Sequence, residues 1–393
     1  MHPRPDGFVA RACAALLDRI DEVVLEVAAA IESTEPVYGA RDLVSTAELH
    51  QNNRTNLVAI LSYLTGSADA PTAAPHETGR RRAEQGVPLP PVLRAYRIGT
   101  RVVWDALLAA AGSDLEANRE LLSMASQVWQ LVDDYSQALT AGYQEAVAER
   151  DRRDARAHDA AFDALLAGQV DGPRLWDCAR TLRLPQQGSY VVVVAADAEV
   201  VPGVAEALAV LGVSSAWRVR LDNQIGVVAL TPRFTPERLA TSLRERRCGR
   251  IGVSSPFSAL TEAPAALRQA EITCAAAIPG EVLHHDQALV PVLLASAPEV
   301  AAALRAAVLG AVLALPEHDR AVLLTTVQAW FDHDGEIAAV AAALYCHRNT
   351  VRFRLNRVAE LTGRRLSAPV AAAQVHLALQ AHRILAGATE RRE

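Results

Sequence analysis

The sequence AAALYCHRNTVRFRL at residues 341–355 decides the fold of the C-terminal part of the chain. Residues 337–344 place apolar side chains on one face of a short helix: Ile337, Val340, Ala341 and Leu344. Residues 345–347 have the length of a tight turn, and a second helix is predicted over residues 348–361. Three apolar residues of that second helix fall in one sector and are expected to bury against the first: Val351, Leu355 and Val358. The stretch therefore predicts a helix-turn-helix.

The opposite face of the second helix carries basic, polar and aromatic side chains. We predict that this face contacts DNA through His347, Arg348, Asn349, Thr350, Arg352, Phe353, Asn356 and Arg357. Arginine can bond the O6 and N7 atoms of guanine in bidentate fashion, and asparagine can do the same with the N6 and N7 atoms of adenine. An amphipathic helical hairpin with a solvated arginine face has the same pattern, so these residues alone leave both interpretations open.

Residues 320–385 resemble the C-terminal domain of the PucR/CdaR regulators, the activators of purine and sugar-diacid catabolism. The resemblance rests on the HRNT sequence at 347–350, on Leu361-Thr362-Gly363 and on Leu366, with Phe353 where the family often has tyrosine. The second helix is also similar to the recognition helix of Fis-type proteins. The resemblance implies a DNA-binding transcriptional regulator and, by family tendency, an activator.

The charge distribution agrees with a local DNA-binding surface. The formal net charge is −6, and a high-GC bacterial coding bias accounts for the fact that all 39 basic residues are arginine. Residues 336–367 contain six arginines and two carboxylates, a net charge of +4, which leaves −10 for the rest of the chain. A basic segment on an acidic body is typical of a protein that binds a phosphate backbone locally.

Several other kinds of protein are not favoured by the sequence. The five cysteines, at positions 13, 178, 248, 274 and 346, form no CxxC pair, so neither a disulfide framework nor a zinc module is expected. We find no nucleotide-binding glycine motif and no HExxH, and His284-His285-Asp286 lacks further metal ligands at a suitable spacing. No signal peptide is recognised, and the longest apolar run, residues 306–315, is about half of a membrane span. We expect a cytoplasmic protein without cofactor, metal or membrane partner.

The periodicity predicts a multidomain, mainly α-helical chain. Residues 1–150 are expected to form a helical sensory or interaction domain, with a loop through residues 67–79 and a helix over residues 92–111. A helix from Leu115 to about Ala148 continues into the charged residues 149–156, which fit either a solvated helix or a signalling helix in a dimer. The α+β domain is expected over residues 158–290, and the all-α helix-turn-helix domain over residues 298–393.

The middle region alternates strand and helix patterns. Strands are predicted over residues 190–195, 217–221, 225–230, 250–254 and 282–284, with helices at 202–211, 236–243 and 261–277, giving a mixed sheet with helices on one face. This region resembles a degenerate GGDEF-like domain, in which the catalytic turn corresponds to Asp222-Asn223-Gln224. That turn lacks the glycine pair and has at most one carboxylate, and Asp197 is a lone acid, so no cyclase activity is expected.

The N-terminal region resembles the N-terminal domain of RsbRD-type stress-signalling proteins over about residues 20–145, on residues 79–89 and 93–99. The resemblance implies a dimeric sensory or interaction module. Three arginines, Arg94, Arg97 and Arg101, share a helical face and either hold an anionic ligand or pair with Glu48, Asp133 or Asp134.

The whole sequence thus predicts a non-enzymatic transcriptional regulator. Its expected partners are double-stranded DNA, a second or further copy of the same chain, and a small-molecule effector bound by the N-terminal or middle domain. The alternative is a protein-interaction module of a stress-signalling complex. The second alternative, an enzyme that retains nucleotide chemistry in the middle domain, is disfavoured by the degenerate turn.

Overall fold

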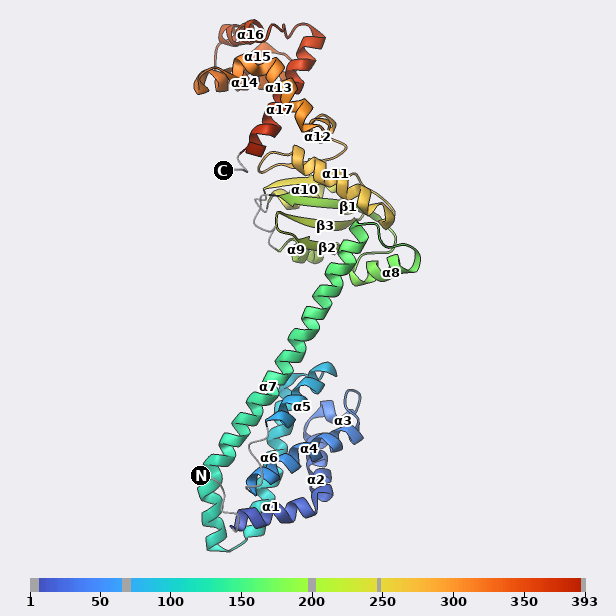
Figure 1. The fold of residues 1–393 in the computed structure, drawn as a ribbon, viewed down its shortest axis with the longest axis vertical. Helices are drawn as coiled ribbons and strands as arrows, with labels where there is room; N and C mark the ends of the chain where they lie inside the picture. Colours follow the sequence, from blue (N-terminus) through green and yellow to red (C-terminus); the bar gives the residue numbers. More distant parts are fainter. Residues whose placement is uncertain (1–6, 66–71, 197–202, 246–248, 390–393) are drawn as a thin grey trace. The chain divides into compact units, whose positions relative to one another are not determined.

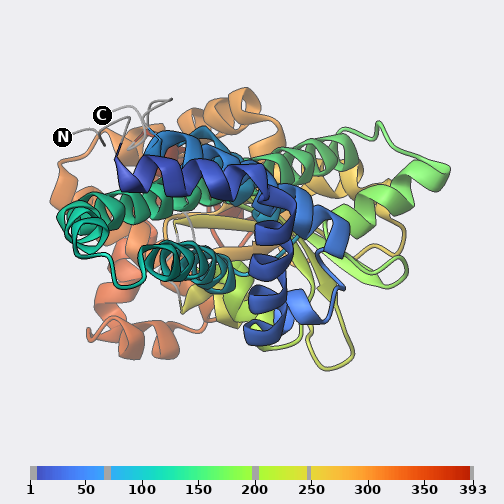
Figure 2. The same cartoon turned by 90° about the horizontal axis from the view of Figure 1, so that it is seen from below.

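The computed structural model describes residues 7–65, 72–196, 203–245 and 249–389. The chain divides into two compact units, Met1–Ala155 and Arg156–Glu393. It is mainly α-helical and contains one mixed five-stranded sheet in its middle region, which confirms the predicted fold class (Figures 1 and 2). Asp197, Pro202 and Cys248, which the sequence singled out, lie outside the described residues.

The N-terminal unit is built from helices alone in its described part. They are α1 (Phe8–Asp18), α2 (Ile20–Thr34), α3 (Pro36–Gly39), α4 (Thr46–Leu64), α5 (Ala73–Glu84), α6 (Leu89–Ala111) and the first part of α7 (Leu115–Leu166). Helix α2 packs against both α4 and α6, and its buried face consists of valine, isoleucine and alanine side chains. The helical interval of these apolar residues is the reason that they share one core.

Helix α5 contradicts the loop that was expected through residues 67–79. The helix begins at Ala73, so the loop prediction is wrong from that residue onward. Pro75 lies in the first turn, where backbone N–H groups have no helical partner, and proline is tolerated there. Gly79 is a contact residue, because a Cβ at this position would lie 2.1 Å from the carbonyl oxygen of Leu139 in α7. Pro75 therefore marks the start of helix α5, and Gly79 allows α5 and α7 to cross closely.

Helix α7 is one continuous element of 52 residues. The charged residues 149–156 are helical, which confirms that the helix predicted from Leu115 continues through them, and the helix extends further to Leu166. Glu149 is half-buried and residues 150–157 are exposed. Its last residues, including Phe162 and Leu165, are buried in the core of the second unit.

The sheet of the second unit has the order β2-β3-β1-β4-β5. The strands are β1 (Ser189–Ala196), β2 (Ser215–Val219), β3 (Asn223–Leu230), β4 (Arg250–Val253) and β5 (Val282–His284). Strands β4 and β5 are parallel and all other neighbours are antiparallel, so the sheet is mixed as predicted. The accompanying helices are α8 (Gly172–Thr181), α9 (Val204–Val210), α10 (Pro236–Arg244) and α11 (Ala263–Ala276), with a short 3-10 turn, η1 (Leu260–Glu262).

The helices cover both faces of the sheet, and the prediction of one covered face is wrong. Tyr190, Val192 and Val194 of β1 pack in one core with α8, α11 and the end of α7. Val191 and Val193 point to the opposite face and pack in a second core with α9 and α10. Successive side chains of a strand alternate between the two faces, so an unbroken apolar strand needs cover on both.

The C-terminal part of the second unit is helical throughout its described residues. It comprises α12 (Leu289–Ser296), α13 (Pro298–Leu313), α14 (Glu317–Asp332), α15 (Ile337–Ala343), α16 (Arg348–Thr362) and α17 (Pro369–Thr389). Helix α13 packs along α17, and α16 contacts α13, α14 and α15. In the described part of the chain, no single helix has the length and apolarity to cross a membrane. Helices α12 and α13 have that length and apolarity only when they are taken together, and the pair is bent by 104°.

Candidate nucleic-acid interface

The turn between α15 and α16 has a defined hydrogen-bond pattern. The N–H of Cys346 donates to the carbonyl of Ala341 at 3.0 Å, and the N–H of Tyr345 donates to the carbonyl of Ala342 at 3.2 Å. These two bonds form a Schellman motif, in which the residue after the helix end adopts a left-handed conformation. Tyr345 occupies that position with φ of 49°, a conformation that costs a non-glycine residue free energy. The motif stops α15 and redirects the chain into α16.

His347 sets the start of α16. It is the N-cap residue, and its Nδ1 accepts a hydrogen bond of 3.2 Å from the backbone N–H of Asn349. One of the N–H groups that lack a helical partner at this end is thereby satisfied. His347 is exposed, so its ring both caps the helix and lies at the surface where DNA contact was predicted.

The buried side of α16 fixes the orientation of the helix. Val351 is fully buried in a small core with Val340 and Ala341 of α15, as expected. Val358 instead belongs to a larger core with α13, α14 and α17, and Leu355 borders both cores. The prediction that all three residues bury against the first helix is therefore wrong for Val358. The second helix therefore buries more of its length than a two-helix hairpin would, because α13 and α14 also pack against it.

The predicted contact residues lie together on the outer side of α16. Thr350 is half-buried, and the other seven are exposed: His347, Arg348, Asn349, Arg352, Phe353, Asn356 and Arg357. Phe353 exposes 71% of its surface, although phenylalanine is among the residue types most often fully buried. These side chains follow the helical repeat, so they form one continuous strip along the exposed face. Whether this strip contacts DNA stays a prediction.

The arginines of this strip differ in their partners. Arg357 forms an ion pair of 3.1 Å with Glu360, one turn further along the helix. Arg348 and Arg352 have no carboxylate within ion-pair distance in the described part of the chain. Two unneutralised guanidinium groups near a helix N-terminus attract anions, because the N-terminus carries a partial positive charge of its own.

Tyr345 is a candidate contact residue that sequence reasoning missed. Its side chain exposes 98% of its surface and lies next to the start of α16. The residue was assigned only to the turn. The left-handed position after a helix end usually holds glycine or asparagine. A tyrosine at this position was the signal in the sequence that could have indicated a role in binding. Arg365, exposed just beyond the helix end, is a second basic residue of this surface that was not assigned a role.

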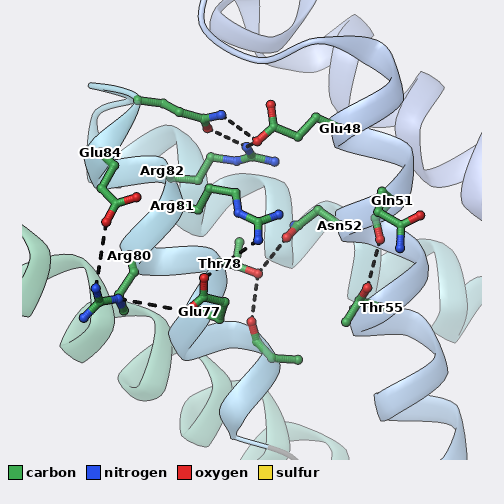
Figure 3. A network of polar contacts seen from close by, with 12 residues as sticks. Glu48, Gln51, Asn52, Thr55, Glu77, Thr78, Arg80, Arg81, Arg82 and Glu84 are labelled. Atoms are coloured by element: carbon green, nitrogen blue, oxygen red, sulfur yellow. Dashed lines mark hydrogen bonds and ion pairs between the residues drawn. The ribbon is translucent and has the colours of Figure 1, made fainter.

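A buried polar network lies inside the N-terminal helical unit (Figure 3). Arg82 exposes only 1% of its surface, and its Nη1 donates to Glu48 at 3.3 Å and to Gln85 at 2.6 Å. In the same region the hydroxyl of Thr78 donates to Asn52 at 2.9 Å. Glu48 thus pairs with Arg82, and the expected pairing of Glu48 with the α6 arginines does not occur.

The arginines of α6 have a different partner. Arg94 makes a bidentate ion pair with Glu35, with 2.9 Å between Nη2 and Oε2. Among the described residues, neither Asp133 nor Asp134, the predicted partners, forms an ion pair with this helix, so the predicted pairing is corrected to Glu35. Glu35 lies at the end of α2 and is almost completely buried, and its position next to α6 could not be read from the spacing of charges along the sequence.

Two ion pairs lie at the hairpin of β2 and β3, whose turn was matched from the sequence to the catalytic turn of a cyclase. The N–H of Arg220 donates to the carbonyl of Asn223 at 2.7 Å, and Leu221, within the turn, is fully exposed. Arg220 pairs with Asp163 of α7 at 3.2 Å, and Arg218 pairs with the same carboxylate. Burial alone would raise the pKa of Asp163, but the two guanidinium groups outweigh it and lower that pKa. No cluster of three or more metal-ligating side chains is found among the described residues.

Comparison with known proteins assigns a domain type to each part of the chain. Residues 21–158 match the family model of the RsbT co-antagonist protein rsbRD N-terminal domain. Residues 167–276 match the GGDEF-like domain, and residues 323–381 match the PucR C-terminal helix-turn-helix domain. The resemblance to PucR/CdaR-type regulators with an RsbRD-type N-terminal domain is therefore confirmed.

Two individual proteins are similar to parts of this chain. The carbohydrate diacid regulator of Escherichia coli (strain K12) is 50% identical over 42 residues, which are 11% of this chain and 11% of that protein. The chain thus spans about a tenth of the length of this curated relative. The crystal structure of a regulator of polyketide synthase expression from Bifidobacterium adolescentis is 21% identical and covers 59% of this chain and 94% of its own, with a TM-score of 0.32.

Proposed function

We propose that this chain is a sequence-specific DNA-binding transcriptional regulator, and that α16 is its recognition helix. The observation that carries the proposal is the exposed strip of α16, where Arg348 and Arg352 lie beside an exposed Phe353 and have no carboxylate partner among the residues that the structure describes. Arginine and asparagine at the surface of a helix of this length can reach base edges in the major groove. The match of residues 323–381 to a helix-turn-helix domain supports the same role.

The oligomeric state on DNA can be argued from the size of a single recognition helix. A single helix contacts too few base pairs for useful specificity, so we propose a homodimer or higher homo-oligomer on two half-sites about 34 Å apart. The input would be a small molecule or a partner protein acting through the N-terminal or middle domain. We further propose that the chain works in the cytoplasm and activates transcription, as PucR/CdaR-type regulators tend to do.

The test is binding of the full chain to DNA from the region upstream of its own gene, with a scrambled duplex of the same composition. Wild type should select the upstream duplex, and its affinity should fall as salt rises, because phosphate contacts release counterions. The double variant Arg348→Ala, Arg352→Ala should lose this selectivity. Equal binding of both duplexes by wild type would refute sequence-specific recognition.

We propose that the middle domain has no diguanylate cyclase activity. Two-metal phosphoryl chemistry requires clustered carboxylates, whereas the turn at Leu221 and Asp222 offers one carboxylate beside two arginines already paired with Asp163. Incubation of the protein with GTP and magnesium should give no cyclic dinucleotide and no pyrophosphate. Release of pyrophosphate above the level of a no-protein control would overturn this part of the proposal.

A second function is supported by the N-terminal match. The RsbRD-type domain over residues 21–158 would make the chain a protein-interaction module of a stress-signalling complex, with DNA binding secondary. Under that alternative, a kinase or phosphatase should co-purify stably with the chain through residues 21–158. Loss of the partner on removal of those residues, with DNA selectivity absent from the full chain, would favour the alternative.

A further inference from the structure

A cleft of about 470 Å³ opens between α6 and α7 in the N-terminal helical unit. Helix α7 contributes Val128, Trp129 and Val132, which recur at the helical interval and face the cleft. Helix α6 contributes Ile98 and Trp104 to the same lining. The volume lies within the range of small-molecule sites in proteins, and most of the lining is apolar, as it is in such sites.

Three arginines line the same cleft from α6. Arg94, Arg97 and Arg101 recur at intervals of three and four residues and therefore form a ladder on one side of that helix. Glu35 also lines the cleft and neutralises Arg94 through its bidentate pair. In the described part of the helical unit, neither Arg97 nor Arg101 has a carboxylate within ion-pair distance. The charged groups that line the cleft, three arginines and one glutamate, leave a net charge of +2.

We propose that this cleft binds an organic carboxylate with an aromatic or branched apolar body. The two unpaired guanidinium groups would hold the carboxylate, because arginine presents parallel N–H donors that match its two oxygens. The apolar body would lie against Trp104, Trp129 and the valines of α7, where it removes apolar surface from water. The assignment of this ligand as the effector rests on the proposed regulatory function, whereas the ligand chemistry rests on the cleft alone.

A second copy of the chain is a less suitable occupant. Trp129 exposes 70% of its surface and could be covered by a partner. In a two-fold dimer, however, the same surface patch faces itself across the interface. Such a contact would bring one net-positive arginine ladder against another, and like charges across an interface oppose association. An anion small enough to enter the cleft neutralises the ladder instead.

The test measures ligand binding to the full chain in the absence of DNA. The probe is 2-naphthoate, followed by tryptophan fluorescence and by calorimetry, with 2-naphthalenemethanol as the uncharged analogue and succinate as the anion without an aromatic body. We expect saturable binding of one naphthoate per chain, and much weaker binding of both analogues. Arg97→Gln and Arg101→Gln should each weaken naphthoate binding about tenfold or more, the effect of losing a charge-assisted hydrogen bond.

The matched control is Arg119→Gln, on α7 and outside the cleft, which removes one exposed arginine and should leave naphthoate binding unchanged. Thermal unfolding of each variant confirms that it is folded. Equal binding of naphthoate and naphthalenemethanol, or no effect of Arg97→Gln and Arg101→Gln, would overturn the proposal. So would absence of naphthoate binding together with a dimer that Trp129→Ala converts to monomer in sedimentation. These readouts contain no DNA, so their failure is distinct from a failure of the regulatory function.

Discussion

Arg352→Ala is the variant that tests the proposed recognition helix most directly. Arg352 lies on the exposed face of α16 and has no ion-pair partner in the described part of the chain, so its removal breaks no intramolecular salt bridge. A surface substitution of this kind should change the free energy of unfolding by no more than about 0.5 kcal/mol. Any larger loss of DNA affinity therefore reports on the complex and not on the fold.

The size of the loss distinguishes two kinds of contact. If Arg352 bonds a guanine edge, its removal should cost about 1–3 kcal/mol per copy, and the loss should be confined to the specific duplex. If Arg352 contacts phosphate, all duplexes should weaken alike, and the slope of log affinity against log salt should fall by about 0.9 per copy. A dimer doubles either figure, so a base contact predicts at least about a thirtyfold weaker complex.

The assay is fluorescence anisotropy of a labelled upstream duplex and its scrambled counterpart, from about 50 to 200 mM salt, the range over which phosphate contacts are well resolved. The matched control is Arg268→Ala on α11, which removes one exposed arginine of the same unit outside the strip. We expect Arg268→Ala to bind as wild type does. Equal losses for Arg352→Ala and Arg268→Ala would show that only net charge matters, and an unchanged Arg352→Ala would refute the assignment of this helix face.

Three further predictions concern stability and can be measured by denaturant or thermal unfolding. Tyr345→Gly should raise the free energy of unfolding by about 0.5–1 kcal/mol, because glycine relieves the left-handed φ of 49°, and a loss of stability would contradict that strain. Gly142→Ala should destabilise by about 1–3 kcal/mol or more, because its Cβ would lie 2.1 Å from the carbonyl oxygen of His76, whereas Gly310→Ala in open space should stabilise by about 0.5–1 kcal/mol. Burial lowers the pKa of His382, so the unfolded chain binds more protons than the folded chain below about pH 6.5, and the free energy of unfolding decreases as the pH is lowered through that range; His382→Gln should reduce this decrease, and parallel stability curves for variant and wild type would contradict it.

The helix-turn-helix could be predicted closely because its signals are local. The apolar face of residues 337–344, the three-residue turn and the apolar sector of the second helix depend only on spacing along the chain. The structure places the second helix at Arg348–Thr362, one residue longer than predicted. Exposure of the predicted contact residues follows from the same periodicity. The role of Val358 could not be found in this way, because its partners in α13 and α17 are brought to it by the tertiary fold.

The predictions that the structure corrects share one physical cause. The structural role of a residue depends on packing partners that are distant from it in the sequence. Gly79 is typical of a turn in isolation, but the nearby backbone of α7 makes it a contact residue of a helix. The α6 arginines could be placed on one face from their spacing, yet the carboxylate that pairs with Arg94 comes from the end of α2. The cover of both sheet faces also depends on the tertiary fold. The unbroken apolar run of β1 nevertheless indicated it, because such a strand is buried on both faces.

The charged end of α7 illustrates how the two interpretations of residues 149–156 can be separated by physical argument. A dimeric coiled coil needs an apolar seam every three or four residues, and residues 149–157 offer only two alanines among charged side chains. Local pairs suffice to explain a helix here, since Glu149 lies 3.3 Å from Arg152 and 3.7 Å from Arg153, and such pairs stabilise an isolated helix by about 0.2–0.5 kcal/mol each. The pattern therefore favours a solvated helix. If two copies associate along α7, the seam must lie elsewhere on that helix, where Leu115, Leu122 and Trp129 are exposed apolar residues spaced one heptad apart.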